Sequence, residues 1–179
     1  EFFLEENKNN QNPFWSKRGR KELNYSLKKN FKTNKLILCD NYLIKNNLYS
    51  KKTYLYLIHV LKNLRDFESS TLILPIKDKY FNDKAKLINF FQKLLKNKSN
   101  LISISLETNA DTKKIINFFK LCKINGIGIT FDTGNVYLNK SSILSYYKSI
   151  KNYINHIHIK DRNSIGENVK LGSGLINFK

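Results

Sequence analysis

Residues 101–132 read LISISLETNADTKKIINFFKLCKINGIGITFD, and this stretch decides the fold prediction. It begins with a short apolar run at 101–106 and ends with another at 127–131, both typical of buried strands. Between them, residues 111–121 place apolar side chains at helical spacing. A strand, a helix and a second strand joined by short connections predict a βαβ unit with parallel strands.

The same alternation extends toward both ends of the chain. We predict strands at 1–4, 36–39, 71–74, 101–106, 127–131 and 154–159, and helices at 21–30, 53–66, 83–96, 111–121 and 142–153. This pattern predicts the α/β class with a mainly parallel sheet, and without a linker or repeat it predicts one domain. Alternation alone leaves a doubly wound sheet and an eight-fold barrel both open.

Length and composition exclude several classes of protein. The 179 residues, 41% hydrophobic, are enough to bury a core. We find no run near the roughly 20 uncharged apolar residues of a membrane-spanning helix. Cys39 and Cys122 lie far apart without a CxxC pattern, which favours a reduced, cytoplasmic protein. The chain starts without Met or a signal peptide and stops after a glycine-containing loop, so we expect a fragment of a longer reading frame.

The net charge of +18, from 32 Lys and Arg against 14 Asp and Glu, raises the hypothesis of nucleic-acid binding. Only four of the 32 are arginine, although arginine is the side chain that most often reads bases and phosphates. The lysines are dispersed along the chain. We therefore favour a solvated basic surface over a nucleic-acid site.

Polar residues follow three consecutive predicted strands. Glu107, Asp132 and His158 stand about one βα unit apart, and chemistry in parallel α/β folds collects at the carboxyl ends of the strands. Their oxygen and imidazole donors suit Mn²⁺, Mg²⁺, Co²⁺ or Zn²⁺. Taken singly, each has a plainer interpretation: a helix cap or solvated group for Glu107, a turn for Asp132. We expect only one of His156 and His158 to face the site.

Several stretches resemble the xylose-isomerase-like TIM barrels, the family of sugar phosphate isomerases and epimerases. The stretches are FDTGN at 131–135, HIHIKDR at 156–162, LGSGLINF at 171–178, NPFWS at 12–16 with Gly19 and Arg20, LCDNYLI at 38–44 and LILP at 72–75. No single motif is decisive, but their order and spacing follow the family. The resemblance implies that residues 1–179 form a single incomplete (β/α)8 TIM barrel, with about strands 2 to 7 present and truncated at both ends.

The resemblance also implies an activity, namely that of a divalent-metal-dependent sugar or sugar phosphate isomerase or epimerase. Glu107, Asp132 and His158 match three of the four metal ligands of the family, and the fourth would lie beyond Lys179. The reaction would be proton abstraction next to a carbonyl through a metal-stabilised enediolate, with Glu107 also serving as an acid/base group.

Substrate contacts are expected on the segments that follow. Lys160 and Arg162 would contact a hydroxyl or phosphate of a small sugar, and the N–H groups of Gly172 and Gly174 would approach a phosphate. The plainer alternatives are an ion pair between Lys160 and Asp161 and glycines that only form turns. The number of subunits is left open, a homo-oligomer included.

Two departures from the family pattern bear on the alternatives. Asn41 stands where the family often has Asp, and Asn135 stands where the related apurinic endonucleases place a His. With three histidines in the chain, the multi-zinc site of those DNA-repair enzymes cannot be assembled. This counts against a DNA-repair endonuclease, which is kept as an alternative hypothesis together with a catalytically inactive barrel fragment.

Overall fold

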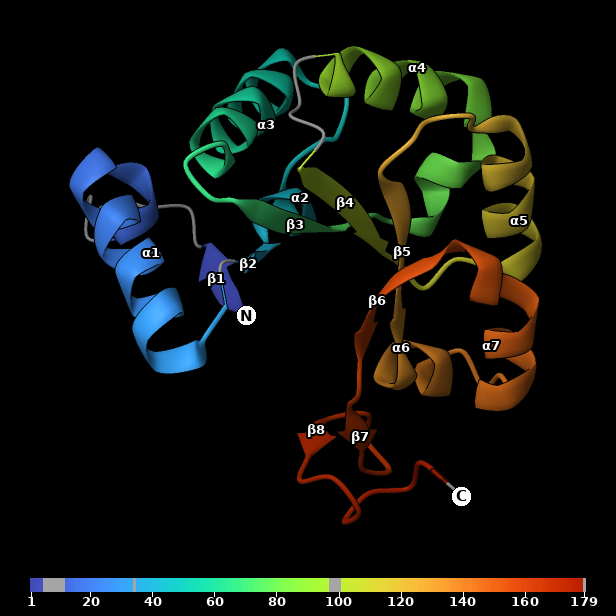
Figure 1. Cartoon of the computed structure of the whole chain (residues 1–179). Helices are drawn as coiled ribbons and strands as arrows, with labels where there is room; N and C mark the ends of the chain where they lie inside the picture. Colours follow the sequence, from blue (N-terminus) through green and yellow to red (C-terminus); the bar gives the residue numbers. More distant parts are fainter. Residues whose placement is uncertain (5–11, 34, 97–100, 179) are drawn as a thin grey trace.

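Six parallel strands form a sheet in which sequence order equals spatial order, β1 to β6 (Figure 1). The computed structural model describes residues 1–4, 12–33, 35–96 and 101–178. The strands are β1 (Phe2–Leu4), β2 (Lys35–Asp40), β3 (Ser69–Pro75), β4 (Ile102–Glu107), β5 (Ile127–Asp132) and β6 (Ile154–His158). A separate antiparallel pair joins β7 (Asp161–Arg162) and β8 (Asn168–Val169).

Helices connect the strands, and α1, α3, α4, α5 and α7 follow an arc around one side of the sheet (Figure 1). They are α1 (Lys17–Phe31), α2 (Tyr42–Lys45), α3 (Lys51–Leu64), α4 (Lys84–Leu95), α5 (Thr112–Leu121), α6 (Thr133–Leu138) and α7 (Ile143–Ile150), with 3₁₀ turns η1 (Pro13–Trp15), η2 (Asp78–Asn82) and η3 (Lys151–Tyr153). The predicted α/β class and its strand–helix alternation are confirmed.

Polar caps start most of these helices. Ser50, Asp83, Asp111 and Ser142 stand at the N-caps of α3, α4, α5 and α7, where each side chain accepts a hydrogen bond from a backbone N–H of the first turn. Such a bond satisfies one of the donors that a helix start leaves without a partner. The helix starts can therefore be located from the sequence to within a few residues.

The core lies between the sheet and its helices. Alternate residues of β3 and β4, such as Leu72 and Ile104, are fully buried and form one cluster with Leu57 and Leu61 of α3. The opposite face carries small and polar side chains on β4 and β5, whereas β2 and β3 also place Ile37 and Ile73 there. On this polar face Ser105 Oγ lies 2.6 Å from Thr130 Oγ1 of the next strand. The alternation of strand side chains thus separates an apolar layer from a polar one.

The predicted TIM barrel is wrong for this structure. Among the described residues the sheet is open, with β1 and β6 as its two edge strands and no pairing between them. The barrel is corrected to an open parallel α/β sheet, and the prediction that residues 1–179 form a single domain truncated at both ends stays a prediction. Motif order determines which strands are neighbours, but edge closure depends on sheet curvature and strand number, which the motifs do not encode.

The stretch at 12–20 has a structural role. The side chain of Asn12 caps η1 and that of Ser16 caps α1. Gly19 lies so close to the backbone of Pro13 that a Cβ would overlap it. Arg20 donates from Nη1 to the carbonyl of Phe14 at 3.0 Å, which ties this turn to the first helix.

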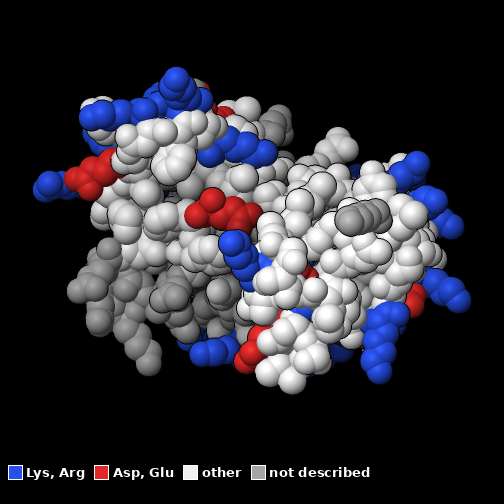
Figure 2. Space-filling model, turned by 90° about the horizontal axis from the view of Figure 1, so that it is seen from below, with Lys and Arg blue, Asp and Glu red and all other residues white. Residues whose placement is uncertain are grey.

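The surface distributes its positive charge over several separate groups. On the face in Figure 2, Lys and Arg side chains form several separate groups, mostly toward the margin, and acidic side chains are interspersed among them. Such a face offers no continuous basic track for a phosphate backbone. Within the described part of the chain, no helix has the length and apolar character needed to cross a membrane.

Candidate functional site

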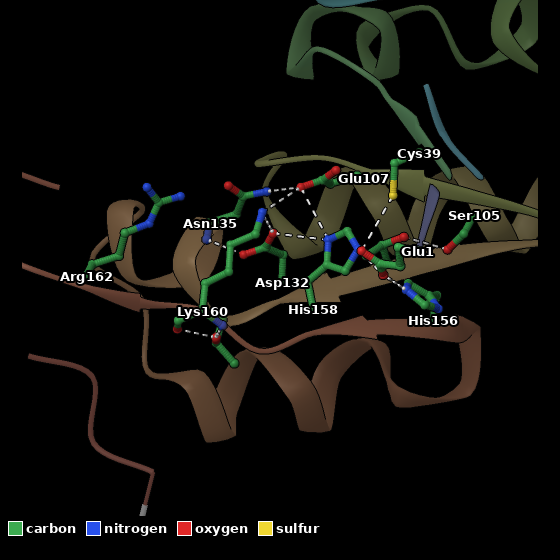
Figure 3. A network of polar contacts seen from close by, with 12 residues as sticks. Glu1, Cys39, Ser105, Glu107, Asp132, Asn135, His156, His158, Lys160 and Arg162 are labelled. Atoms are coloured by element: carbon green, nitrogen blue, oxygen red, sulfur yellow. Dashed lines mark hydrogen bonds and ion pairs between the residues drawn. The ribbon is translucent and has the colours of Figure 1, made fainter. Parts of the chain in front are cut away.

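Three side chains from adjacent strand ends meet at the carboxyl edge of the sheet (Figure 3). Glu107, Asp132 and His158 are the last residues of β4, β5 and β6. His158 Nδ1 lies 3.7 Å from Glu107 Oε1 and 3.5 Å from Asp132 Oδ2, and the three donor atoms all lie within 4.8 Å of one another. The structure therefore brings together the three residues selected from the sequence.

Asp132 divides its two carboxylate oxygens between folding and the site. Oδ1 accepts the backbone N–H of Asn135 at 3.0 Å and so caps α6. Oδ2 faces His158 and Lys160. Because the cap fixes the carboxylate and its side chain is only 1% exposed, Oδ2 is held rigidly toward the other two donors.

Lys160 is the cation of this cluster. Its Nζ lies 2.6 Å from Asp132 Oδ2 and 3.4 Å from Glu107 Oε1. Its backbone N–H donates to Thr133 Oγ1 at 2.8 Å, and the Thr133 hydroxyl donates back to the Lys160 carbonyl at 2.7 Å. This exchange fixes the chain after β6, so the lysine predicted to contact substrate faces the carboxylates. Its predicted pairing with Asp161 is replaced by these contacts.

The electrostatics of the cluster favour charged side chains. Burial opposes the charge on His158, but Asp132, Cys39, Glu107 and the nearby Glu1 raise its pKa to about 12. Burial likewise opposes ionisation of Asp132, yet its contacts with His158 and Lys160 lower its pKa well below the usual range. The cluster therefore favours an ionised Asp132 carboxylate balanced by cationic His158 and Lys160.

His158 is the histidine of the pair that faces the cluster, as expected, but His156 lies on the same face of β6 and contacts Glu1 instead. Residues two apart on a strand share a face, so both rings of β6 lie on the polar side of the sheet. His156 Nε2 lies 2.7 Å from Glu1 Oε1, and His158 Nε2 lies 2.9 Å from the same oxygen. The spacing of two residues between His156 and His158 was the sequence signal that both rings share one face of β6. Glu1 gave no sequence signal, because its contacts cross to another strand.

The remaining predicted substrate contacts lie outside this cluster. Gly172 and Gly174 donate their backbone N–H groups to Asp161 Oδ2 at 3.0 and 2.8 Å, so a buried carboxylate occupies the place expected for a phosphate. Arg162 donates from Nη1 to the carbonyl of Gly166 at 2.8 Å. Asp161 also accepts the Ile176 N–H, at 3.1 Å, and thereby organises the loop after β7.

A cleft of about 830 Å³ opens beside the cluster. Glu107, His158 and Lys160 line it, with Lys77 adding a further cation and Ile157 an apolar surface. This volume lies in the range of small-molecule sites. The cleft thus gives the cluster a space in which a ligand of sugar size fits.

A separate observation indicates that these donor atoms suit a divalent metal. Among the described residues, Asp132 Oδ2 and His158 Nδ1 are both buried and form no hydrogen bond, although Oδ2 forms an ion pair with Lys160. Buried polar atoms without hydrogen bonds are uncommon, and metal coordination is one arrangement that satisfies them. Both atoms point at the position that Glu107 Oε1 also faces.

Fold and site together define a parallel α/β protein with a carboxylate and imidazole cluster at adjacent strand ends. No protein-family model and no curated protein sequence matches the chain. A solved structure of the E. coli 3-keto-D-glucoside 4-epimerase YcjR, in its apo form, is similar to it with a TM-score of 0.69 at 12% identity, covering 93% of this chain and 71% of that one.

A second solved structure, described as AsfvAP:AG, is similar with a TM-score of 0.62 at 17% identity. The match covers 90% of this chain and 62% of that one, so this chain spans less than two thirds of AsfvAP. At these identities both likenesses show the fold alone. The family resemblance read from the motifs stays a prediction.

Proposed function

We propose that the chain is a divalent-metal-dependent isomerase or epimerase of a small sugar or sugar phosphate, with Glu107, Asp132 and His158 holding the metal. The observation that carries this proposal is the convergence of three donor atoms from three adjacent strand ends within 4.8 Å. The shared fold with a solved 3-keto-D-glucoside 4-epimerase supports the substrate class.

The chemistry divides between the metal and the side chains. When bound, a divalent metal supplies a Lewis acid that stabilises negative charge developing on a substrate carbonyl oxygen. Glu107 would take a proton from the carbon next to that carbonyl. Delivery of a proton to the neighbouring carbon then completes an isomerisation, and delivery to the opposite face of the same carbon by a second acid/base group completes an epimerisation. In the described part of the chain, the hydrogen bonds and ion pairs of Glu107 all use Oε1. Oε2 is therefore the oxygen that reaches the substrate proton.

Two lysines give the cleft its preference for substrate oxygens. Lys160 lies beside the carboxylates, and Lys77 lines the same cleft. An ammonium group donates up to three hydrogen bonds to hydroxyl or phosphate oxygens. Gly172 and Gly174 are left out of this assignment because their N–H groups donate to Asp161, and Arg162 is left out because its Nη1 donates to the Gly166 carbonyl in the loop after β7.

Metal binding is tested by calorimetric titration of the chain with Mn²⁺. We expect one strong site, weakened at least tenfold in Asp132→Asn and in His158→Ala, because each change removes a ligand. Glu22→Gln is the matched control, since Glu22 is an exposed carboxylate of α1 that pairs with its own helix neighbour Arg18. Equal Mn²⁺ affinity in all four proteins would contradict the proposed ligand set.

The reaction is tested by proton exchange in D₂O, followed by NMR on a panel of ketoses, keto-sugars and their phosphates. We expect metal-dependent deuterium incorporation next to the carbonyl, reduced about 10²- to 10⁴-fold in Glu107→Gln because an amide cannot accept the proton. Exchange that persists at full rate in this variant would sink the assignment of Glu107. Metal binding without any exchange would favour the inactive-fragment alternative.

A further inference from the structure

A second group of potential metal ligands lies on the polar face of the sheet, next to the proposed catalytic cluster. Glu1 Oε1 lies 2.7 Å from His156 Nε2 and 2.9 Å from His158 Nε2 (Figure 3). The two imidazole rings are perpendicular, with centroids 5.0 Å apart. One donor atom from each of the three residues lies within 4.8 Å of the other two.

The donor types favour zinc. Two imidazole nitrogens and one carboxylate oxygen are ligands that Zn²⁺ commonly takes, with bonds of about 2.0–2.2 Å. Donors around a tetrahedral zinc are therefore about 3.3 Å apart. The present separations of 2.7 and 2.9 Å need to lengthen by only a few tenths of an ångström. The Cys39 sulfur, 3.7 Å from Glu1 Oε2, adds a soft atom to the surroundings.

The three ligands come from opposite edges of the sheet. Glu1 directly precedes β1, and both histidines belong to β6. No backbone pairing joins these two strands among the described residues. We propose that Glu1, His156 and His158 form a zinc site that ties the β1 edge of the sheet to the β6 edge. Zinc bound there stabilises the fold, because an unfolded chain does not hold ligands this distant in sequence together.

The site does not depend on the proposed sugar chemistry, although the two sites share His158. This residue turns Nδ1 toward Glu107 and Asp132 and Nε2 toward Glu1. A neutral imidazole has a single lone pair for a metal. A test of the zinc site is therefore cleanest in a variant in which Glu107 and Asp132 no longer offer carboxylates to a metal at His158 Nδ1.

The experiment uses the full chain carrying Glu107→Gln and Asp132→Asn, titrated with Zn²⁺ by calorimetry and by thermal unfolding. We expect one zinc per chain, and a rise in the unfolding midpoint of roughly 5–10 °C at a hundredfold excess over Kd. In a triple variant that also carries His156→Gln, we expect neither zinc binding nor a rise in the unfolding midpoint. Adding His59→Gln instead is the matched control, since His59 lies on α3 and is exposed.

Two results would overturn the zinc site. One is that zinc does not raise the unfolding midpoint of the Glu107→Gln, Asp132→Asn double variant. The other is that zinc raises this midpoint equally when His156→Gln is added. If the double variant does not fold, the same comparison is made between the unaltered chain and His156→Gln alone. In that comparison, zinc must raise the unfolding midpoint less in His156→Gln than in the unaltered chain. Loss of sugar chemistry in Glu107→Gln leaves these outcomes unchanged, so the two proposals fail separately.

Discussion

Lys160 places an ammonium group where a divalent metal would meet its carboxylate ligands, 2.6 Å from Asp132 Oδ2. We predict that Lys160→Met strengthens Mn²⁺ binding about tenfold, because like charges at this range cost on the order of 1–2 kcal/mol even in a solvated cleft. Calorimetric titration measures the change. Lys120→Met, on the exposed side of α5, should leave the affinity unaltered. An unchanged affinity in Lys160→Met would show that the ammonium group does not compete with the metal.

Asp40 is a buried carboxyl whose ionisation works against folding. Burial raises its pKa from about 3.8 to about 6, despite hydrogen bonds from the Tyr42 N–H and the Tyr56 hydroxyl. Between these two values the folded chain binds more protons than the unfolded chain, so stability falls as pH rises from about 4 to about 6. The loss at neutral pH is about 3 kcal/mol.

We therefore predict that Asp40→Asn is more stable than the unaltered chain at pH 7, by up to about 3 kcal/mol, and nearly equal to it near pH 4. Urea unfolding at several pH values measures the difference. Asp78→Asn, which changes a partly exposed carboxylate of η2, should keep the original pH dependence. A pH profile that Asp40→Asn leaves intact would place the titrating group elsewhere.

At the scale of elements, the junction of β4, β5 and β6 depends on one close approach. The Asn155 amide lies over Gly128 of β5, where a Cβ would overlap it. That amide donates from Nδ2 to the Ile104 carbonyl at 3.0 Å and accepts the Ser105 hydroxyl at 2.6 Å. The register of β5 and β6 shifts between Ile129 and Thr130, beside this contact.

We predict that Gly128→Ala destabilises the chain by about 1–3 kcal/mol, because the added methyl displaces Asn155 and overpacks the junction. Denaturant unfolding measures the loss. The double variant Gly128→Ala, Asn155→Ala should recover part of it by removing the side chain that the methyl meets. Additive losses in the double variant would mean that the two positions do not interact.

At the scale of the whole molecule, the net charge of +18 is spread over the surface. Some of it is paired, as in the contacts of Lys28 with Glu68 and of Lys114 with Asp78. We predict only weak binding to mixed-sequence duplex DNA, falling at least tenfold between 50 and 200 mM salt. Fluorescence anisotropy measures this, and salt-resistant binding would revive the nucleic-acid hypothesis.

Much of the local structure could be predicted because its causes are local. Apolar runs bounded by turns marked the strands, and Asp111 and Ser142 stand at the starts of helices that they cap. The strand-end positions of Glu107, Asp132 and His158 followed from the same reasoning, since parallel strands present their carboxyl ends at one edge. Each inference needed only neighbours in sequence and the period of the element.

By itself, therefore, the sequence determined the α/β class, the succession of strands and helices along the chain, and three residues of the candidate site. Tertiary structure alone decided that the sheet is open, that Glu1 meets two histidines of β6, and that Asp161 takes the N–H groups of Gly172 and Gly174. The physical reason is the distance along the chain over which each effect acts. Periodicity and capping act within one element, whereas edge pairing and cross-sheet contacts depend on the curvature of the whole sheet.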